Sequence, residues 1–263
     1  MKNLILKSFL NLLSTFIHVM AKLSCYFILG LGSILVSITL FPILKIFVHP
    51  WERFARLCRR FISCTLRWYF KYMQLVKVAK IEVSDLEKLK SLKSAIVVAN
   101  HPSMLDSVLL ISFLPCTDFI VKASLKKRNV LGGIVRNLYI PNSMDYDVVL
   151  ERCKENLAAG GTLTLFPEGT RSPASGQKPF KKGAARVSLA TGCPILPVHI
   201  GGNEKRGLRK HDSFFWIPKE KTYRYVFTVG DFVYPDEYRD LPDPIAAKRY
   251  TEKLQEILAD KNY

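Results

Sequence analysis

The first 48 residues are dominated by apolar side chains. Within residues 1–22 these recur every three or four positions among a few polar ones, which predicts an amphipathic helix. Residues 23–44 carry no charged side chain, and a run of that length can cross or embed in a bilayer. A single span and a re-entrant hairpin of 1–22 with 23–48 fit this pattern equally, and a buried helix of a soluble protein is the remaining alternative. We therefore predict that residues 1–48 form a membrane anchor.

The next segment, residues 49–80, combines helical periodicity with strong positive charge. Apolar residues fall at intervals of three or four from Trp51 onward, and Arg and Lys fill most positions between them. This predicts a basic amphipathic helix whose charged face contacts anionic lipid headgroups or, alternatively, faces solvent while the helix packs on the domain. Because basic residues gather after the apolar run, the positive-inside rule places the rest of the chain on the cytoplasmic side of the inner membrane.

From residue 81 the pattern changes to short apolar runs that alternate with helical periodicity. Such alternation predicts an α/β domain over residues 81–263, with a mixed central sheet flanked by helices. We expect strands at 95–99, 118–121, 162–166, 194–200 and 223–229. We expect helices at 103–113, 123–137, 146–159, 183–191 and 245–260.

Charge and cysteine content narrow the possible partners. The formal net charge is +17, which favours an anionic partner such as nucleic acid or a membrane surface. The long uncharged segment, and the lack of a zinc or RNA-binding sheet signature, argue for the membrane and against nucleic acid. The six cysteines are scattered without a Cys-x-x-Cys pair, so neither a disulfide framework nor a metal site is expected.

The first stretch with recognisable chemistry follows the predicted strand 95–99. The apolar run ends at Asn100-His101-Pro102, and Pro102 suits the first position of a helix that begins near residue 103. Asp106 would then lie about one and a half turns into that helix, close enough to hold one imidazole nitrogen of His101. The other nitrogen could take a proton from a hydroxyl, as a general base does. Alone, a His and an Asp at this spacing are weak evidence.

A second stretch follows the predicted strand 162–166. That strand ends in Pro167-Glu168-Gly169-Thr170-Arg171-Ser172, an acid, a glycine and an arginine in one loop. Gly169 lets backbone approach a ligand, and Arg171 offers a forked grip on an oxyanion. A structural ion pair made by Glu168 is the alternative. Both stretches lie where strands end, which is where α/β sheets bind ligands.

Together, Asn-His-x4-Asp and Phe-Pro-Glu-Gly-Thr-Arg-Ser resemble the glycerolipid acyltransferase superfamily, which includes the bacterial lysophosphatidic acid acyltransferases. The resemblance covers residues 95–200 and implies an acyl thioester donor, from acyl carrier protein or coenzyme A, with no further cofactor. It implies that His101 is the catalytic base and Asp106 its partner. The resemblance also indicates the residues that bind the lysolipid acceptor, to which we add two neighbouring side chains: Glu168, Gly169, Thr170, Arg171, Ser103 and Lys122.

The chain departs from the family pattern at one place. An acid-arginine pair is usual between the two main motifs, but the corresponding residues here are Pro141 and Asn142. The resemblance makes lysophosphatidate the first expected acceptor. Because of this departure, another lysolipid or a non-glycerol acceptor is the alternative. No Gly-x-Ser-x-Gly elbow is present, so we expect no acyl-enzyme. A hydrolase that uses the same His-Asp pair and a non-catalytic membrane-surface protein are the remaining hypotheses.

Overall fold

The computed structural model describes residues 2–121, 139–141, 145–172, 177–209, 211–213 and 215–259. Three expectations therefore lie outside the described residues: the helix at 123–137, the side chain of Lys122, and Asn142.

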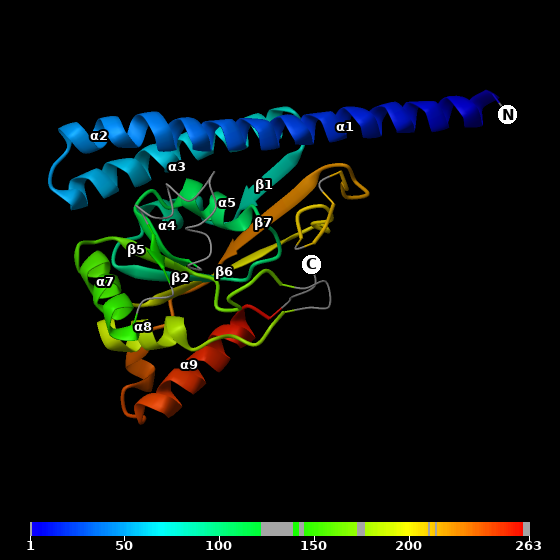
Figure 1. Cartoon of the computed structure of the whole chain (residues 1–263). Coiled ribbons are helices and arrows are strands. Elements are labelled where there is room, and N and C mark those ends of the chain that lie inside the picture. Colours follow the sequence, from blue (N-terminus) through cyan, green and yellow to red (C-terminus); the bar gives the residue numbers. More distant parts are fainter. Residues whose placement is uncertain are drawn as a thin grey trace.

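The N-terminal segment is one long helical rod (Figure 1). Helix α1 (Lys2–Leu35) continues through a π-helical turn η1 (Val36–Leu40) into α2 (Phe41–Phe47). The alternative of a hairpin between 1–22 and 23–48 is wrong in position, because the helix continues without a turn past residue 22. The chain turns instead at residues 48–50, and α3 (Trp51–Leu75) runs back beside the rod.

Helix α3 joins the rod to the rest of the molecule. Its apolar stripe is buried, and it packs against α5 (Asp106–Phe113). The helix was expected to continue to residue 80, but it ends at Leu75, and Lys77 takes a left-handed conformation at φ +58°. That turn redirects the chain into strand β1 (Ala79–Val83), which the helical periodicity had concealed.

A seven-stranded sheet forms the centre of the described chain. Its strands are β1, β2 (Ala95–Ala99), β3 (Thr117–Val121), β4 (Ile140–Pro141), β5 (Thr162–Leu165), β6 (Ile195–Gly202) and β7 (Tyr223–Val229). They lie in the order β1-β7-β6-β2-β5-β3-β4. Every neighbouring pair is parallel except β6 and β7, so the sheet is mixed, as predicted.

Apolar layers cover both faces of the sheet. Side chains alternate along β2, so that Val97 and Ala99 pack toward α3 and α5, while Ile96 and Val98 pack into a second cluster. A short helix, α4 (Leu86–Ser91), contributes to the first layer. The second layer holds α7 (Tyr146–Ala158), α8 (Gly183–Thr191), the 3-10 helix η3 (Pro235–Tyr238) and α9 (Asp243–Ile257) (Figure 1).

The rod is attached to this domain by polar contacts. The ammonium of Lys22 is buried, and its Nζ donates to the Trp216 carbonyl at 2.5 Å, the Tyr223 hydroxyl at 3.0 Å and the Gly207 carbonyl at 3.3 Å. Nearer the N-terminus, the Lys221 ammonium donates to the Asn11 side-chain oxygen at 2.8 Å. These contacts fix which side of α1 faces the domain.

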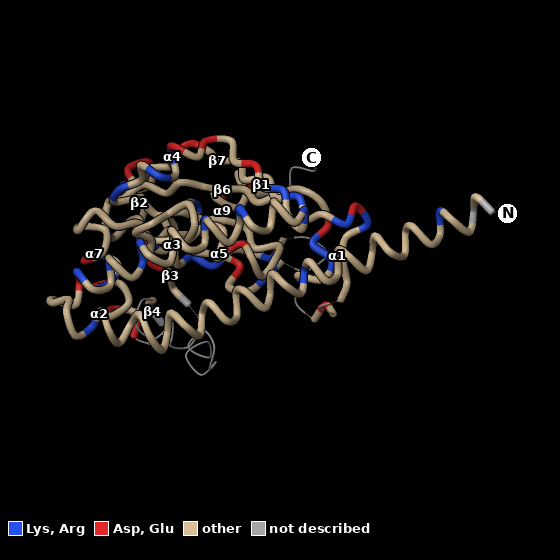
Figure 2. The backbone as a smooth tube through the Cα atoms, turned by 90° about the horizontal axis from the view of Figure 1, so that it is seen from above, with Lys and Arg blue, Asp and Glu red and all other residues tan. Residues whose placement is uncertain are grey.

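Most of the rod nevertheless remains apolar and uncovered. Figure 2 shows few charged residues along α1, and its large apolar side chains are mostly exposed. Residues 5–47 form the helical stretch of the described chain that is long and apolar enough to cross a membrane.

Candidate active site

The two sequence motifs meet at one edge of the sheet. Strands β2 and β5 are parallel neighbours, so their carboxyl ends place His101 and Glu168 side by side. The Asn100 amide extends the pairing beyond β2: its oxygen accepts from the Ile200 N–H at 2.6 Å, and its nitrogen donates to the Ile200 carbonyl at 3.0 Å. These two hydrogen bonds to β6 hold the end of β2 in place directly before His101.

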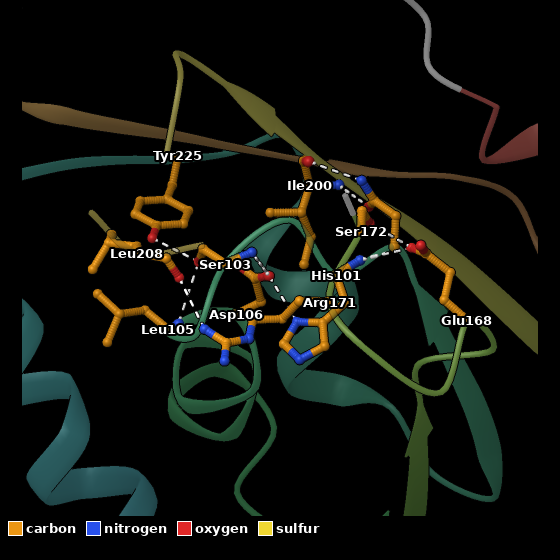
Figure 3. Close-up of polar contacts among 11 residues, drawn as sticks. His101, Ser103, Leu105, Asp106, Glu168, Arg171, Ser172, Ile200, Leu208 and Tyr225 are labelled. Carbon is orange, nitrogen blue, oxygen red and sulfur yellow. Dashed lines mark hydrogen bonds and ion pairs between the residues drawn. The ribbon is translucent and has the colours of Figure 1, made fainter. Parts of the chain in front are cut away.

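His101 and Asp106 form the pair that their spacing predicts (Figure 3). The distance between Nδ1 of His101 and Oδ2 of Asp106 is 2.9 Å. The carboxylate is fully buried, whereas the imidazole is 17% exposed. Because Asp106 accepts at Nδ1, the imidazole carries its proton there when neutral, and Nε2 is the nitrogen free to act as a base.

Helix α5 begins later than predicted, and this places Asp106 differently. The helix begins at Asp106 itself, not at residue 103, and residues 103–105 form a turn. In that turn Ser103 donates twice to Asp106, from its N–H at 2.6 Å and from its hydroxyl at 2.5 Å. Ser103 is completely buried, so in this structure it supports the carboxylate where we had expected a substrate contact.

A tyrosine that the sequence analysis missed completes this support. The Tyr225 hydroxyl lies 2.9 Å from the Ser103 hydroxyl, and the Lys205 ammonium lies 4.6 Å from the centre of the Tyr225 ring. Burial raises the pKa of Tyr225 well above its ordinary value, so the phenol stays neutral. Burial also lowers the pKa of Lys205 to about 8, although the nearby Asp106 charge opposes this shift. The antiparallel pairing of Tyr225 with Gly202 brings it to this edge.

Phe166 holds the other side of the imidazole. Its ring is stacked on His101 with centroids 4.2 Å apart and an interplanar angle of 17°. Phe166 follows β5 directly, so the same strand end that carries Glu168 also limits rotation of the base. The alternating apolar run of 162–166 contained this residue but gave no sign of the stacking.

Glu168 joins three segments of the site. Its Oε1 accepts from the Ser172 hydroxyl at 2.6 Å and from the His101 N–H at 3.3 Å, and its Oε2 accepts from the Lys178 N–H at 3.1 Å. The side chain is 4% exposed. The alternative we considered for Glu168 was an ion pair with a neighbouring base. In the described part of the chain its carboxylate instead accepts from two backbone N–H groups and a hydroxyl. Glu168 therefore shapes the loop that presents Gly169 and Arg171.

Arg171 and Gly169 lie in that loop. The Arg171 guanidinium donates to the Leu208 carbonyl at 3.2 Å, and the same carbonyl accepts from the Met104 N–H at 3.1 Å. Gly169 has φ +65°, a backbone conformation that residues other than glycine rarely adopt. Thr170 is half-buried between them. The structure thus brings together the predicted site residues it describes.

The arrangement suits proton transfer to His101 beside an arginine that can pair with an anionic ligand. The partly exposed imidazole is oriented by a buried carboxylate, and the loop that carries Arg171 lies at the same carboxyl end of the sheet. Among the described residues, no group of three or more His, Cys, Asp or Glu side chains is placed to hold a metal ion.

Comparisons with known proteins show what the chain is similar to. The model of the family described as Acyltransferase matches residues 80–201, which contain both motifs. The matched residues make up just under half of the chain. The chain is 30% identical over 184 residues to the chloroplastic 1-acyl-sn-glycerol-3-phosphate acyltransferase BAT2 of Brassica napus, covering 65% of this chain and 51% of that protein.

Two further proteins match over more of their own length. A Mycoplasma pneumoniae protein named "Probable 1-acyl-sn-glycerol-3-phosphate acyltransferase" is 28% identical over 248 residues, covering 89% of this chain and 88% of that one. The crystal structure of the 1-acyl-sn-glycerophosphate (LPA) acyltransferase PlsC from Thermotoga maritima superposes with a TM-score of 0.64 at 22% identity. The superposition covers 94% of this chain and 98% of that chain, which confirms the fold. The chain spans about half the length of the plant relatives it matches.

Proposed function

We propose that this protein transfers a fatty acyl group from a thioester to the free hydroxyl of lysophosphatidate, which yields phosphatidate for phospholipid synthesis. The observation that carries the proposal is the His101–Asp106 pair beside the Glu168–Arg171 loop at a shared sheet edge. The names of the relatives support the choice of acceptor.

The proposed reaction begins with the acceptor hydroxyl at Nε2 of His101. Nε2 takes the hydroxyl proton while the oxygen attacks the thioester carbonyl, and the positive charge on the imidazole is stabilised by Asp106. Asp106 keeps its own orientation through the two Ser103 donors. We therefore assign Ser103 to positioning in place of substrate binding.

The second half of the reaction returns the proton. The tetrahedral intermediate collapses, the carbon–sulfur bond breaks, and the thiolate takes the proton from the His101 imidazolium to leave as a thiol. The acyl group moves directly from sulfur to oxygen, so no acyl-enzyme forms. Acyl-coenzyme A and acyl carrier protein both fit this scheme as donors, and no cofactor or metal is required by it.

Acceptor binding is assigned to the loop that Glu168 shapes. Arg171 is half-buried and would pair with the phosphate of the acceptor, while Gly169 and Thr170 let the glycerol backbone approach. Lys122 remains a candidate for the same phosphate. The absence of an arginine at the Pro141-Asn142 position keeps a different lysolipid or non-glycerol hydroxyl as the second candidate acceptor.

Membrane lipids are the natural surroundings of such a reaction. We propose that the apolar rod and basic α3 hold the domain on the cytoplasmic face of the inner membrane, with lysolipid drawn from the bilayer. The exposed apolar side chains of α1 and the Arg-rich face of α3 support this placement.

The central test replaces the proposed base. His101→Ala should lower kcat by about 10²–10⁴-fold with little change in thermal stability, since the imidazole is partly exposed. Purified protein would receive acyl-coenzyme A or acyl carrier protein donors with a panel of lysolipids and other hydroxylated acceptors, and products would be identified by mass spectrometry. A wild-type rate in the His101→Ala variant would refute the assignment of the base.

The same assay separates the alternatives. Phosphatidate formed only by wild type supports the proposed reaction. A new ester formed from another acceptor, with lysophosphatidate unused, would move the same chemistry to that acceptor. Free fatty acid without a new ester would indicate a hydrolase, and membrane binding without any product would indicate a non-catalytic surface protein.

A further inference from the structure

A hollow lies at the turn between the rod and α3, and the α3 residues that line it lie on the side away from the buried apolar stripe of that helix. Its volume is about 370 Å³. The end of α2 contributes an apolar part, Phe47 and Val48, and the first turns of α3 contribute Leu57. The remaining lining side chains are basic: His49, Arg53, Arg56 and Arg60.

The three arginines share one face of α3. Their spacing of three and four residues places them on successive turns of the helix, above the same hollow. All three are exposed, and none forms an ion pair or hydrogen bond with another side chain in the part of the chain that the structure describes. Glu52, the acid nearest to them in sequence, does not line the hollow. Their charge is therefore available to an external anion.

We use the word rim for the exposed apolar residues Phe47, which lines the hollow, and Ile46 and Trp51, which lie close to it in sequence. Phe47 is 77% exposed and Ile46 is 70% exposed, and the exposed indole of Trp51 lies at the start of α3. This rim continues the uncovered apolar surface of the rod, so the hollow lies at the boundary between a lipid-facing surface and a basic one. A ligand that fits both must carry an anion and an apolar part in one molecule.

We propose that this hollow binds the phosphate monoester headgroup of an anionic glycerolipid, with its acyl chains along the apolar rim. A phosphomonoester carries close to two negative charges and three terminal oxygens, which match several guanidinium forks better than the single charge of a phosphodiester does. The apolar rim distinguishes a lipid from free phosphate. This site uses none of the residues of the proposed reaction, so it does not depend on that proposal.

The test compares two pairs of basic residues on the same helix. Arg56→Gln with Arg60→Gln alters the hollow, and Arg67→Gln with Lys71→Gln is the control. Both pairs have four-residue spacing, carry the same charge and are exposed. Because the two pairs are eleven residues apart, they lie on nearly the same face of α3, about three turns from each other. General attraction to an anionic surface would weaken equally in both variants.

Binding of the full chain would be measured by flotation with phosphatidylcholine vesicles that contain either phosphatidate or phosphatidylglycerol at equal surface charge. We expect wild type and the control pair to prefer phosphatidate by about tenfold, and the hollow variant to lose that preference. All variants should lose binding to phosphatidylglycerol to a similar extent, about fivefold per basic residue removed. An Arg171→Gln variant should keep the preference, which separates the hollow from the proposed active site.

Three results would overturn the proposal. One is a wild-type protein without preference for phosphatidate at equal surface charge. Another is an equal loss of preference in the hollow and control pairs. The last is displacement from phosphatidate vesicles by millimolar inorganic phosphate, which would show that the arginines bind free phosphate without need of the lipid. Circular dichroism would confirm that each variant is folded before the comparison is made.

Discussion

The carboxylate of Asp106 has hydrogen-bond partners beyond the imidazole of His101. Both of its oxygens accept from Ser103, and Oδ2 also faces Nδ1 of His101. Behind Ser103 stands the neutral phenol of Tyr225. A fully buried carboxylate without these donors would cost several kcal/mol, so the serine and tyrosine make it possible to keep a charge there.

Removal of the Tyr225 hydroxyl tests this support. Tyr225→Phe keeps the buried ring but leaves the Ser103 hydroxyl with one partner fewer, so the carboxylate should be less well oriented. We expect kcat to fall by about 3- to 10-fold with KM for both substrates unchanged, since the tyrosine would touch neither. Steady-state kinetics would check this. A rise in KM with kcat unchanged would instead place Tyr225 in substrate binding.

At this scale the sequence predicts contacts within a motif better than contacts between distant segments. The His101–Asp106 bond was predictable because five residues across a strand-to-helix turn allow few geometries. The role of Tyr225 was not, because it depends on the antiparallel pairing of β7 with β6, and Tyr225 reads as an ordinary strand residue. The environment of Ser103 was missed because the helix starts three residues later than Pro102 suggested.

Among the elements, α3 is tied to the sheet by an ion pair in an otherwise apolar contact. The Arg59 guanidinium lies 2.9 Å from the Asp118 carboxylate, and both side chains are largely covered. Burial raises the pKa of Asp118 from 3.8 to about 6, against the opposing effect of Arg59. Asp118 immediately precedes Phe119 in β3, so this pair connects α3 to the strand next to β5.

This shift predicts a pH dependence of stability. Between about pH 4 and pH 6 the folded protein keeps the Asp118 proton that the unfolded chain has lost, so stability should fall as pH rises through this window. The loss should approach about 3 kcal/mol by pH 7. Unfolding in detergent micelles across this range would measure it, with Asp118→Asn as the reference. Parallel pH curves for wild type and Asp118→Asn would contradict the shift.

Element positions were predictable where periodicity is uninterrupted. Strands at 95–99 and 223–229 and the helix at 183–191 have the bounds that the pattern predicted. Strand β1 was missed because its alternation follows a helical stripe without a Gly or Pro between them, and Lys77 makes the turn instead. Strand β4 has only two residues, too few for any pattern to show.

At the scale of the whole molecule, the length of the rod can be compared with the thickness of a bilayer. A helix over residues 5–47 spans about 65 Å, roughly twice the hydrocarbon thickness of a bilayer. Its second half packs on α3, while the stretch near Asn11 contacts the domain on one side through Lys221. The opposite side of that stretch is apolar and exposed. Two neighbouring positions should therefore differ sharply in their contact with lipid.

A comparison of Leu10→Asp with Asn11→Asp tests this difference. Both variants add one negative charge to the same turn of α1. Leu10 is exposed and apolar, so an aspartate there should lower vesicle binding by at least about tenfold. Asn11 already faces the Lys221 ammonium, so an aspartate there should have little effect. Equal losses in the two variants would show that this part of α1 does not enter the lipid on one preferred side.

The pairing of β1 with β7 also determines when the sheet can be completed during synthesis of the chain. Ala79 pairs with Tyr223, so β1 leaves the ribosome long before β7, its one neighbour among the described strands, exists. By then the apolar rod and α3 have already been made. The newly made β1 therefore waits with unpaired edges until β7 is made. A stalled or truncated chain that lacks β7 would expose strand edges of both β1 and β6. We expect such fragments to aggregate readily and to be quickly degraded.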